Sequence, residues 1–155
     1  MVDVCDFISK PTQWRGAGMG KDIARMIAAE LFDISDRCVS VELLFSYFLD
    51  DPLALHMSIL IGDMLVSEWV FARDLAMAGT RYRVGDGAVS VWPAVDNSVV
   101  IRIQDGMKRA LLRLNADELA DFTSETYELV GNGEEFRHVD IGRAVALQCG
   151  MVSDQ

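Results

Sequence analysis

Residues 66–79 decide the fold, and they read Val-Ser-Glu-Trp-Val-Phe-Ala-Arg-Asp-Leu-Ala-Met-Ala-Gly. Trp69, Phe71 and Arg73 lie two positions apart, and a period of two is typical of a β-strand because successive side chains point to opposite faces of a sheet. Good helix formers follow Arg73, and Gly79 can take the left-handed conformation that comes after a helix end. The stretch therefore predicts a strand that runs directly into about one or two helical turns.

The segments before this stretch predict a meander of antiparallel strands. The strand expected over residues 39–50 is apolar on both faces. One face carries Val41, Leu43, Phe45 and Tyr47, and the other carries Leu44 and Phe48. A strand with two apolar faces is covered on both sides. Turn sequences at residues 50–52 and 62–63 connect this strand to the strands expected over residues 53–61 and around Trp69.

A later hairpin predicts a cationic site. Strands are expected over residues 89–93 and 98–104, and Asp105-Gly106 is the strongest short hairpin signal in the chain. A two-residue loop there places Arg102 opposite Arg109, while one face of the hairpin holds Val99, Ile101, Ala110 and Leu112. Like charges directly opposite each other destabilise an antiparallel pair by roughly 0.2–1 kcal/mol. We therefore expect an anionic group at Arg102 and Arg109: an Asp or Glu of this chain or a neighbouring subunit, or alternatively a phosphate or an acidic partner peptide.

Helices are predicted on both sides of these strands. Asn115 can cap a helix in which Glu118 completes a capping box, and its buried stripe is expected to contain Leu119, Phe122, Thr126, Leu129 and Val130. A second short helix is expected over residues 140–148. Residues 1–20 are expected to form a loose arm. Residues 21–32 have apolar side chains at helical spacing and predict an amphipathic helix. We expect it to pack on this sheet or on that of a neighbouring subunit, or alternatively to dock on a partner.

Four ordered blocks of sequence resemble a known family. They are Val41-Glu-Leu-Leu, Asp51-Pro-Leu-Ala, Trp69-Val-Phe-Ala-Arg-Asp-Leu-Ala-Met-Ala-Gly and Gly85-Asp-Gly-Ala-Val-Ser-Val-Trp-Pro. In this order they resemble the SsgA-like family of actinobacterial sporulation and cell-division proteins. The resemblance covers residues 39–136, which suggests a division into residues 1–38, an N-terminal arm and helix, and residues 39–155, an SsgA-like domain.

The resemblance implies a fold, an assembly and a partner. The fold is expected to be similar to that of the whirly single-stranded-DNA-binding proteins, and the assembly is expected to be a trimer. The function implied is the positioning or activation of the tubulin-like division protein FtsZ at septa, often during sporulation. No catalytic roles are attached to the family blocks.

Composition narrows the classes of function. The chain has 155 residues, enough for one domain, and 51% of them are hydrophobic, which favours oligomerisation. The formal net charge is −10, which disfavours a general nucleic-acid binder. No apolar run reaches the roughly 18–20 residues of a membrane helix, and the N-terminus lacks the features of a secretory signal. We therefore expect a cytoplasmic protein whose Cys5, Cys38 and Cys149 are reduced.

The sequence provides little support for a metal-binding, phosphate-binding or catalytic site. His56 and His138 have no ligand partner at metal-binding spacing, and Gly85-Asp-Gly87 does not match a phosphate-binding loop. A nucleophilic pair of Cys38 and His56 stays open, because such residues need to be close only in space. We predict no catalytic residue, no cofactor and no metal.

The expected architecture is α+β, with two antiparallel sheets or one strongly curved sheet of about six to eight strands. The main functional hypothesis is a non-enzymatic regulator of septation that binds itself and FtsZ or another septal protein, without inserting into a membrane. The alternative is single-stranded nucleic-acid binding through a group of cationic residues: Arg81, Arg83, Arg102, Lys108, Arg109 and Arg113. A third hypothesis is an enzyme that uses Cys38 or a pair of acidic residues that are close only in space.

Overall fold

The computed structural model describes residues 21–138, and within them seven strands form one antiparallel sheet with the order β4-β3-β2-β1-β7-β6-β5. The strands are β1 (Lys21–Phe32), β2 (Cys38–Phe48), β3 (Ala54–Ile61), β4 (Met64–Ala72), β5 (Val89–Ala94), β6 (Ser98–Asp105) and β7 (Lys108–Asn115). Helix α2 (Arg73–Gly79) follows β4, and helix α3 (Ala116–Leu129) and the 3-10 helix η1 (Glu135–His138) follow β7. The predicted α+β class with one curved sheet is confirmed. The arm of residues 1–20 and the helix expected over residues 140–148 lie outside the described residues.

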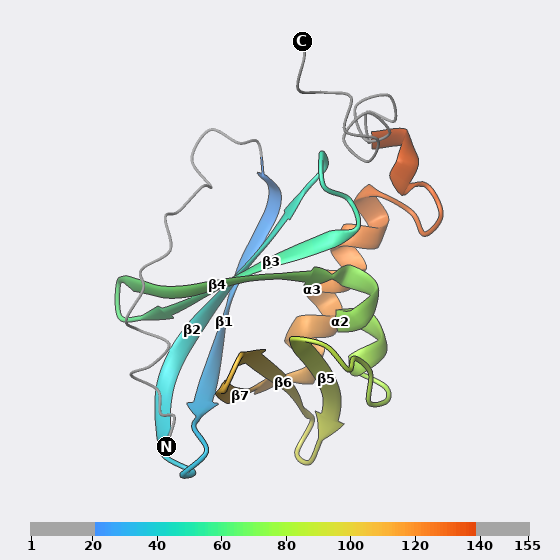
Figure 1. Cartoon of the computed structure of the whole chain (residues 1–155). Helices are drawn as coiled ribbons and strands as arrows, with labels where there is room; N and C mark the ends of the chain where they lie inside the picture. The colour runs from blue at the N-terminus through green and yellow to red at the C-terminus, as the bar shows by residue number, and fades with distance from the viewer. Residues whose placement is uncertain (1–20, 139–155) are drawn as a thin grey trace.

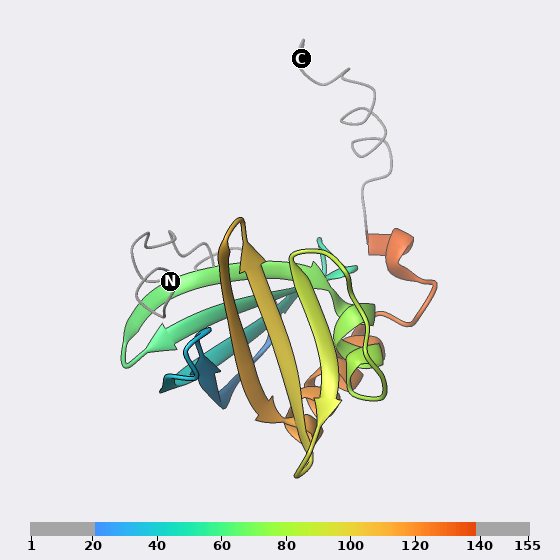
Figure 2. The ribbon, with the colours of Figure 1, turned by 60° about the horizontal axis from the view of Figure 1, so that its bottom comes forward.

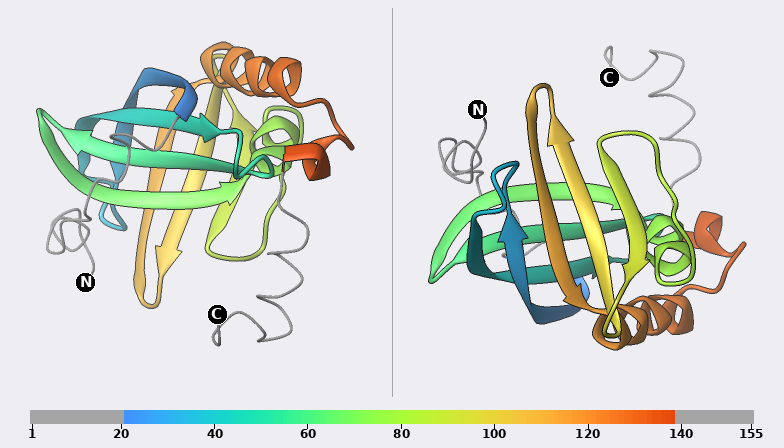
Figure 3. Two further views of the ribbon diagram at one scale, coloured as in Figure 1. Left: turned by 90° about the horizontal axis from the view of Figure 1, so that it is seen from above. Right: turned by 90° about the horizontal axis from the view of Figure 1, so that it is seen from below.

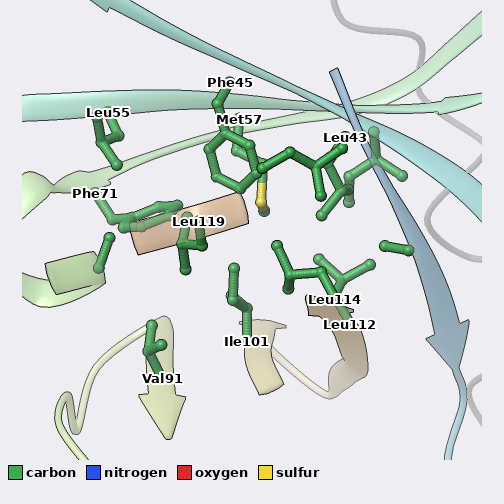
Figure 4. Close-up of a cluster of buried hydrophobic side chains, with 14 of the residues drawn as sticks. Leu43, Phe45, Leu55, Met57, Phe71, Val91, Ile101, Leu112, Leu114 and Leu119 are labelled. Carbon is green, nitrogen blue, oxygen red and sulfur yellow. The ribbon is translucent and has the colours of Figure 1, made fainter. Parts of the chain in front are cut away.

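The sheet bends so that its two halves face each other across the core. Strands β5–β7 cross β2–β4 at a steep angle (Figures 2 and 3), and α2 and α3 lie together at one side of the sheet (Figure 1). Leu43 and Phe45 of one half, and Ile101 and Leu112 of the other, point into the space between the halves (Figure 4). All four are 0% exposed, so the alternation read in residues 39–50 and 98–104 marks the inner face of the sheet.

Helix α3 starts as predicted. Asn115 Oδ1 accepts a hydrogen bond from the backbone N–H of Glu118 at 2.9 Å, and Leu119, Phe122 and Thr126 are buried. The ring of Phe122 lies 5.8 Å from that of Phe45, centroid to centroid, which ties the helix to β2. Leu129 is 43% exposed because the helix ends there, and its predicted place in the buried stripe is wrong.

The helix predicted over residues 21–32 is also wrong, because these residues form β1. This strand lies in the middle of the sheet, pairing with β2 along its length and with β7 over residues 29–32. Ile27, Ala29 and Leu31 are buried, and the residues between them point outward. Pairing on both sides overrides the helix propensity of an alanine-rich segment, because intrinsic propensity is a weaker determinant than tertiary context. The division at residues 38 and 39 stays a prediction, but β1, on its N-terminal side, belongs to the sheet.

The register predicted for the β6–β7 hairpin is wrong by two residues. The loop residues are Gly106 and Met107, and Asp105 pairs with Lys108, so that Arg102 lies opposite Leu111 and Arg109 opposite Gln104. Gly106 has a φ of +63° and occupies the first loop position, where a type II′ hairpin turn places glycine. A shift of two preserves the faces, so Val99, Ile101, Ala110 and Leu112 are buried together as expected.

Gly79 is required by close packing and not by a left-handed helix end. Its φ is not positive, and it is the last residue of α2, with Thr80 as the C-cap. A Cβ atom placed on Gly79 would lie 2.1 Å from Val91 Cγ1 of β5. The missing side chain therefore lets α2 lie directly on β5.

We expect Gly79→Ala to destabilise the protein by about 1–3 kcal/mol through overpacking, although alanine favours a helix by about 1 kcal/mol relative to glycine. Urea unfolding of Gly79→Ala, Val91→Ala and the double variant measures this. The substitution at residue 79 should cost less when Val91 is already alanine. Gly87→Ala is the matched control, because a Cβ atom there has no neighbour within 4 Å; equal effects of the two glycine substitutions would contradict this packing.

Arg73 joins the two helices from inside the protein. Its side chain is 0% exposed, and its guanidinium donates to the backbone oxygen of Thr126 at 2.9 Å and to Glu135 Oε1 at 3.2 Å. The guanidinium also lies 4.0 Å from the centre of the Tyr127 ring and 5.5 Å from that of Tyr47. One buried cation thus holds the start of α2 against the end of α3, η1 and β2.

We expect Arg73→Met to destabilise the protein by about 3–5 kcal/mol, because it leaves Glu135 without its buried partner. Arg81→Met removes an exposed arginine and should change stability by less than about 0.5 kcal/mol.

The backbone N–H of Glu135 and the Arg73 guanidinium hold the pKa of Glu135 below its ordinary value, against the effect of burial. Because this pKa is lower in the folded protein, ionised Glu135 stabilises the fold at pH values above the ordinary glutamate pKa of about 4.3. This stabilisation is lost as the pH falls.

The stability difference between the parent protein and Arg73→Met should therefore shrink from pH 7 toward pH 3. Urea unfolding curves followed by circular dichroism across this range measure the difference. A gap that stays constant with pH would show that Glu135 does not respond to Arg73.

Candidate partner-binding cleft

Arg102 and Arg109 reach one cleft even though they do not lie directly opposite each other. The cleft has a volume of about 310 Å³ and lies on the outer face of β5–β7, beside the turn between β1 and β2. We call it the arginine cleft, and its main lining residues are Phe32, Ile34, Arg83, Trp92, Arg102 and Arg109. The predicted pair is thus joined by a third arginine from the loop between α2 and β5, which sequence reasoning did not place there.

Arg102 is held in the cleft by a relay of hydrogen bonds. Its guanidinium donates to Ser90 Oγ on β5 at 2.9 Å, and Ser90 Oγ donates to the backbone oxygen of Gly85 at 2.8 Å. Ser90 is fully buried, so the relay is fixed. Arg102 Nε is buried and has no hydrogen-bond partner.

Arg83 enters the cleft by stacking on an aromatic ring. Its guanidinium carbon lies 4.2 Å from the centre of the Trp92 ring, a distance typical of a cation–π contact. The backbones of Val84 and Val91 are hydrogen-bonded in both directions at 2.9 Å, which fixes the loop beside β5. A loop without periodicity carries no sequence signal for such a contact.

Two acidic residues at the cleft do not neutralise these arginines. Asp33 and Asp36 line it, but Asp33 accepts hydrogen bonds from the backbone N–H groups of Ser35 and Arg37 and from Arg37 Nε. Burial acts to raise the pKa of Asp33, and these three donors outweigh it, so the pKa lies below its ordinary value. Asp33 therefore serves the β1–β2 turn. No acidic residue among residues 21–138 forms an ion pair with Arg83, Arg102 or Arg109.

Arg113, another member of the proposed cationic group, is already paired. It donates to Glu30 Oε1 at 2.6 Å, and this hydrogen bond and its charge lower the pKa of Glu30. The pair lines a second, larger cavity of about 630 Å³ between β1 and the turn that joins β5 to β6. That cavity contains acids that include Glu42 and Asp96, so it is a poor site for a polyanion.

The nucleophilic pair left open by the sequence does not form. His56 pairs with Ser46 in the sheet, eight residues from Cys38 along β2, a separation of about 26 Å in an extended strand. His56 is hydrogen-bonded to Asp51 at 3.0 Å. Partial desolvation of the exposed Cys38 thiol raises its pKa, and the neighbouring Glu30 carboxylate raises it further. Cys38 thus lacks the environment of a reactive thiolate.

Metal and membrane sites were also sought in residues 21–138. Within this segment no three His, Cys, Asp or Glu side chains are grouped in a way that could hold a metal ion. None of its helices is long and apolar enough to cross a membrane.

The curved sheet with its helical cap and arginine cleft defines a small α+β protein whose candidate site suits binding. A family model described as Streptomyces sporulation and cell division protein, SsgA, matches residues 41–135. The chain therefore belongs to the SsgA family of sporulation and cell-division proteins, as its four sequence blocks suggested.

Individual relatives agree with this assignment. The sporulation-specific cell division protein SsgB of Saccharopolyspora erythraea is 33% identical over 132 residues, which cover 82% of this chain and 94% of that protein. The SsgB of Thermobifida fusca is 34% identical over 103 residues, covering 64% of this chain and 75% of the relative.

Solved structures show the same fold. The crystal structure of an SsgA-like sporulation-specific cell division protein from Thermobifida fusca superposes with a TM-score of 0.73 at 29% identity, covering 85% of this chain and 98% of the other. A structure from work on SsgB mutations and longitudinal cell division in Streptomyces coelicolor gives a TM-score of 0.70 at 31% identity, covering 79% and 99%.

We expect iodoacetamide to alkylate Cys38 more slowly than free cysteine at pH 8, because the raised pKa leaves less thiolate. The measurement uses a Cys5→Ser/Cys149→Ser background, so that only Cys38 reacts. Glu30→Gln removes the neighbouring charge, lowers the thiol pKa and should speed the reaction. A parent rate above that of free cysteine would restore the case for a reactive thiol.

Proposed function

We propose that this protein is a non-enzymatic regulator of cell division that acts as an oligomeric adaptor at the division septum, binding FtsZ or the machinery that localises it. Membership of the SsgA family carries the proposal, because the matched relatives are sporulation-specific cell division proteins. The separation of Cys38 from His56 removes the main support for a catalytic role. An adaptor needs only a binding surface, and the arginine cleft offers one.

Self-association is part of the proposal. Among residues 21–138, strand β4 lies at one edge of the sheet and pairs with β3 alone, so the outer backbone groups of this edge are candidates for pairing with a strand of another copy. Met64 and Val70 of β4 are each about half exposed, which supports contact with another copy. A trimer is the assembly that the family resemblance implies.

Single-stranded nucleic-acid binding is the competing function. It is drawn from the whirly-like fold that the family resemblance implies and is supported locally by a group of six cationic side chains, but one of these, Arg113, is paired with Glu30. The remaining cluster lies on a chain of net charge −10. A nucleic-acid complex should lose orders of magnitude in affinity between about 50 and 200 mM salt.

We expect the immobilised full chain to retain purified FtsZ, and to bind a dT oligonucleotide at least tenfold more weakly than FtsZ. The same pull-down should compare residues 21–155 with the full chain. Truncation at residue 38 is unsuitable because it removes β1, the central strand. Failure of the full chain to retain FtsZ, or tight salt-dependent binding of the oligonucleotide, would contradict the adaptor function.

A further inference from the structure

We propose that the arginine cleft binds a short acidic segment of a protein partner that carries at least two carboxylates next to an apolar side chain. This proposal rests on the adaptor function above and specifies the chemistry of the partner. The partner's carboxylates form the ion pairs with Arg83, Arg102 and Arg109 that the acidic residues of the described part of the chain do not form.

The distribution of ion pairs singles out the cleft. Four described arginines each form an ion pair with a carboxylate of this chain: Arg25, Arg37, Arg73 and Arg113. Among residues 23–136, whose side chains the structure describes, the arginines without such a pair are Arg81, Arg83, Arg102 and Arg109, and three of these four line one cleft. In a chain with 24 acidic residues, unpaired cations gathered at one place indicate a site for an external anion.

The donor geometry suits carboxylates. A guanidinium has five N–H donors in a planar fork that matches a carboxylate with two parallel hydrogen bonds. Arg102 uses one of its N–H donors in the hydrogen bond to Ser90. Arg109 makes no side-chain hydrogen bond to the described residues. Because Ser90 and Gly85 hold Arg102 in place before any ligand arrives, little side-chain freedom is lost on binding.

The rest of the lining suits a peptide. Phe32, Ile34 and Leu111 are apolar and line the same cleft as the arginines, and Ile34 is 49% exposed. An acidic segment with an apolar side chain between its carboxylates would cover this apolar surface while it pairs with the guanidinium groups.

The same lining argues against a nucleic-acid strand. Strand binding requires a positive groove that follows the backbone and aromatic faces on which bases stack. Here one face of Trp92 is covered by Arg83, so this face is not open to a stacking base. A cleft of about 310 Å³ holds a few side chains, and the net charge of −10 on the chain disfavours a longer polyanion.

The test uses a fluorescein-labelled pool of octapeptides in which Asp or Glu alternates with Leu or Phe. A matched pool contains Asn and Gln in place of the acids. Fluorescence anisotropy should show binding of the acidic pool to the full chain, with the amide pool at least tenfold weaker. In 1H–15N spectra the acidic pool should shift the Nε–H signals of Arg102 and Arg109.

Arg102→Gln/Arg109→Gln should weaken binding of the acidic pool about tenfold or more. Arg102 is partly buried, so Arg83→Gln/Arg109→Gln, which changes two exposed side chains, is the second variant and should weaken binding similarly. Arg81→Gln removes an exposed, unpaired arginine outside the cleft and is the matched control for Arg109→Gln; it should leave the affinity within about twofold.

Four results would overturn the proposal. The first three are equal binding of the two pools, unchanged binding by both double variants, and tighter binding of a dT oligonucleotide than of the acidic pool. A change in oligomeric mass of the double variants by light scattering would assign the cleft to a second copy of the chain and would also overturn it.

FtsZ retention separates this proposal from the adaptor function. If both double variants retain FtsZ as the parent does, the cleft is not the contact, although the adaptor function stands. If the parent binds the acidic pool through the arginines but does not retain FtsZ, the cleft proposal stands and FtsZ is not the partner.

Discussion

The structure depends on one buried cation, Arg73. A charge that is removed from water is tolerated only when hydrogen bonds and an opposite charge surround it, and here these come from the end of α3 and from η1. Arg73 is also the first residue of α2. The position of α2 is therefore set by residues that lie more than fifty positions later in the chain, and the helices close one side of the curved sheet as a unit (Figure 1).

The arginine cleft is a consequence of this arrangement. With α2 held by Arg73, Gly79 lets the helix end directly against Val91 of β5. The chain then returns along β5, where the bridge between Val84 and Val91 holds the loop at the edge of the sheet. This loop supplies Arg83, and its Gly85 carbonyl orients the serine that holds Arg102. The residues around Arg73, which belong to one of the four family blocks, thus influence the shape of the candidate site through packing, although they do not contact it.

The sequence predicted the elements whose signals are local. The strand-to-helix stretch, the Asn115 cap and the alternation in β2 each depend on the properties of neighbouring residues. Strand β1 could not be predicted in this way, because Ile23, Ile27 and Leu31 lie four positions apart, a spacing that fits one face of a strand and one face of a helix equally well. Its strand conformation is decided by β2 and β7, to which it is hydrogen-bonded in the middle of the sheet.

The candidate site shows which errors in a predicted strand register still leave each side chain on the correct face of the sheet. The β6–β7 register was shifted by two residues, and a shift of two moves a side chain along its face without turning it over. Arg102 and Arg109 therefore stayed on the outer face, close enough to share a cleft, although they are not direct partners. The position of Arg83 could not be predicted in this way, because the position of a loop residue is set by the packing of neighbouring elements and not by alternation along a strand. The cationic character of this face could be predicted from alternation alone. The third arginine of the cleft could not, because its loop is placed by the way α2 docks on β5.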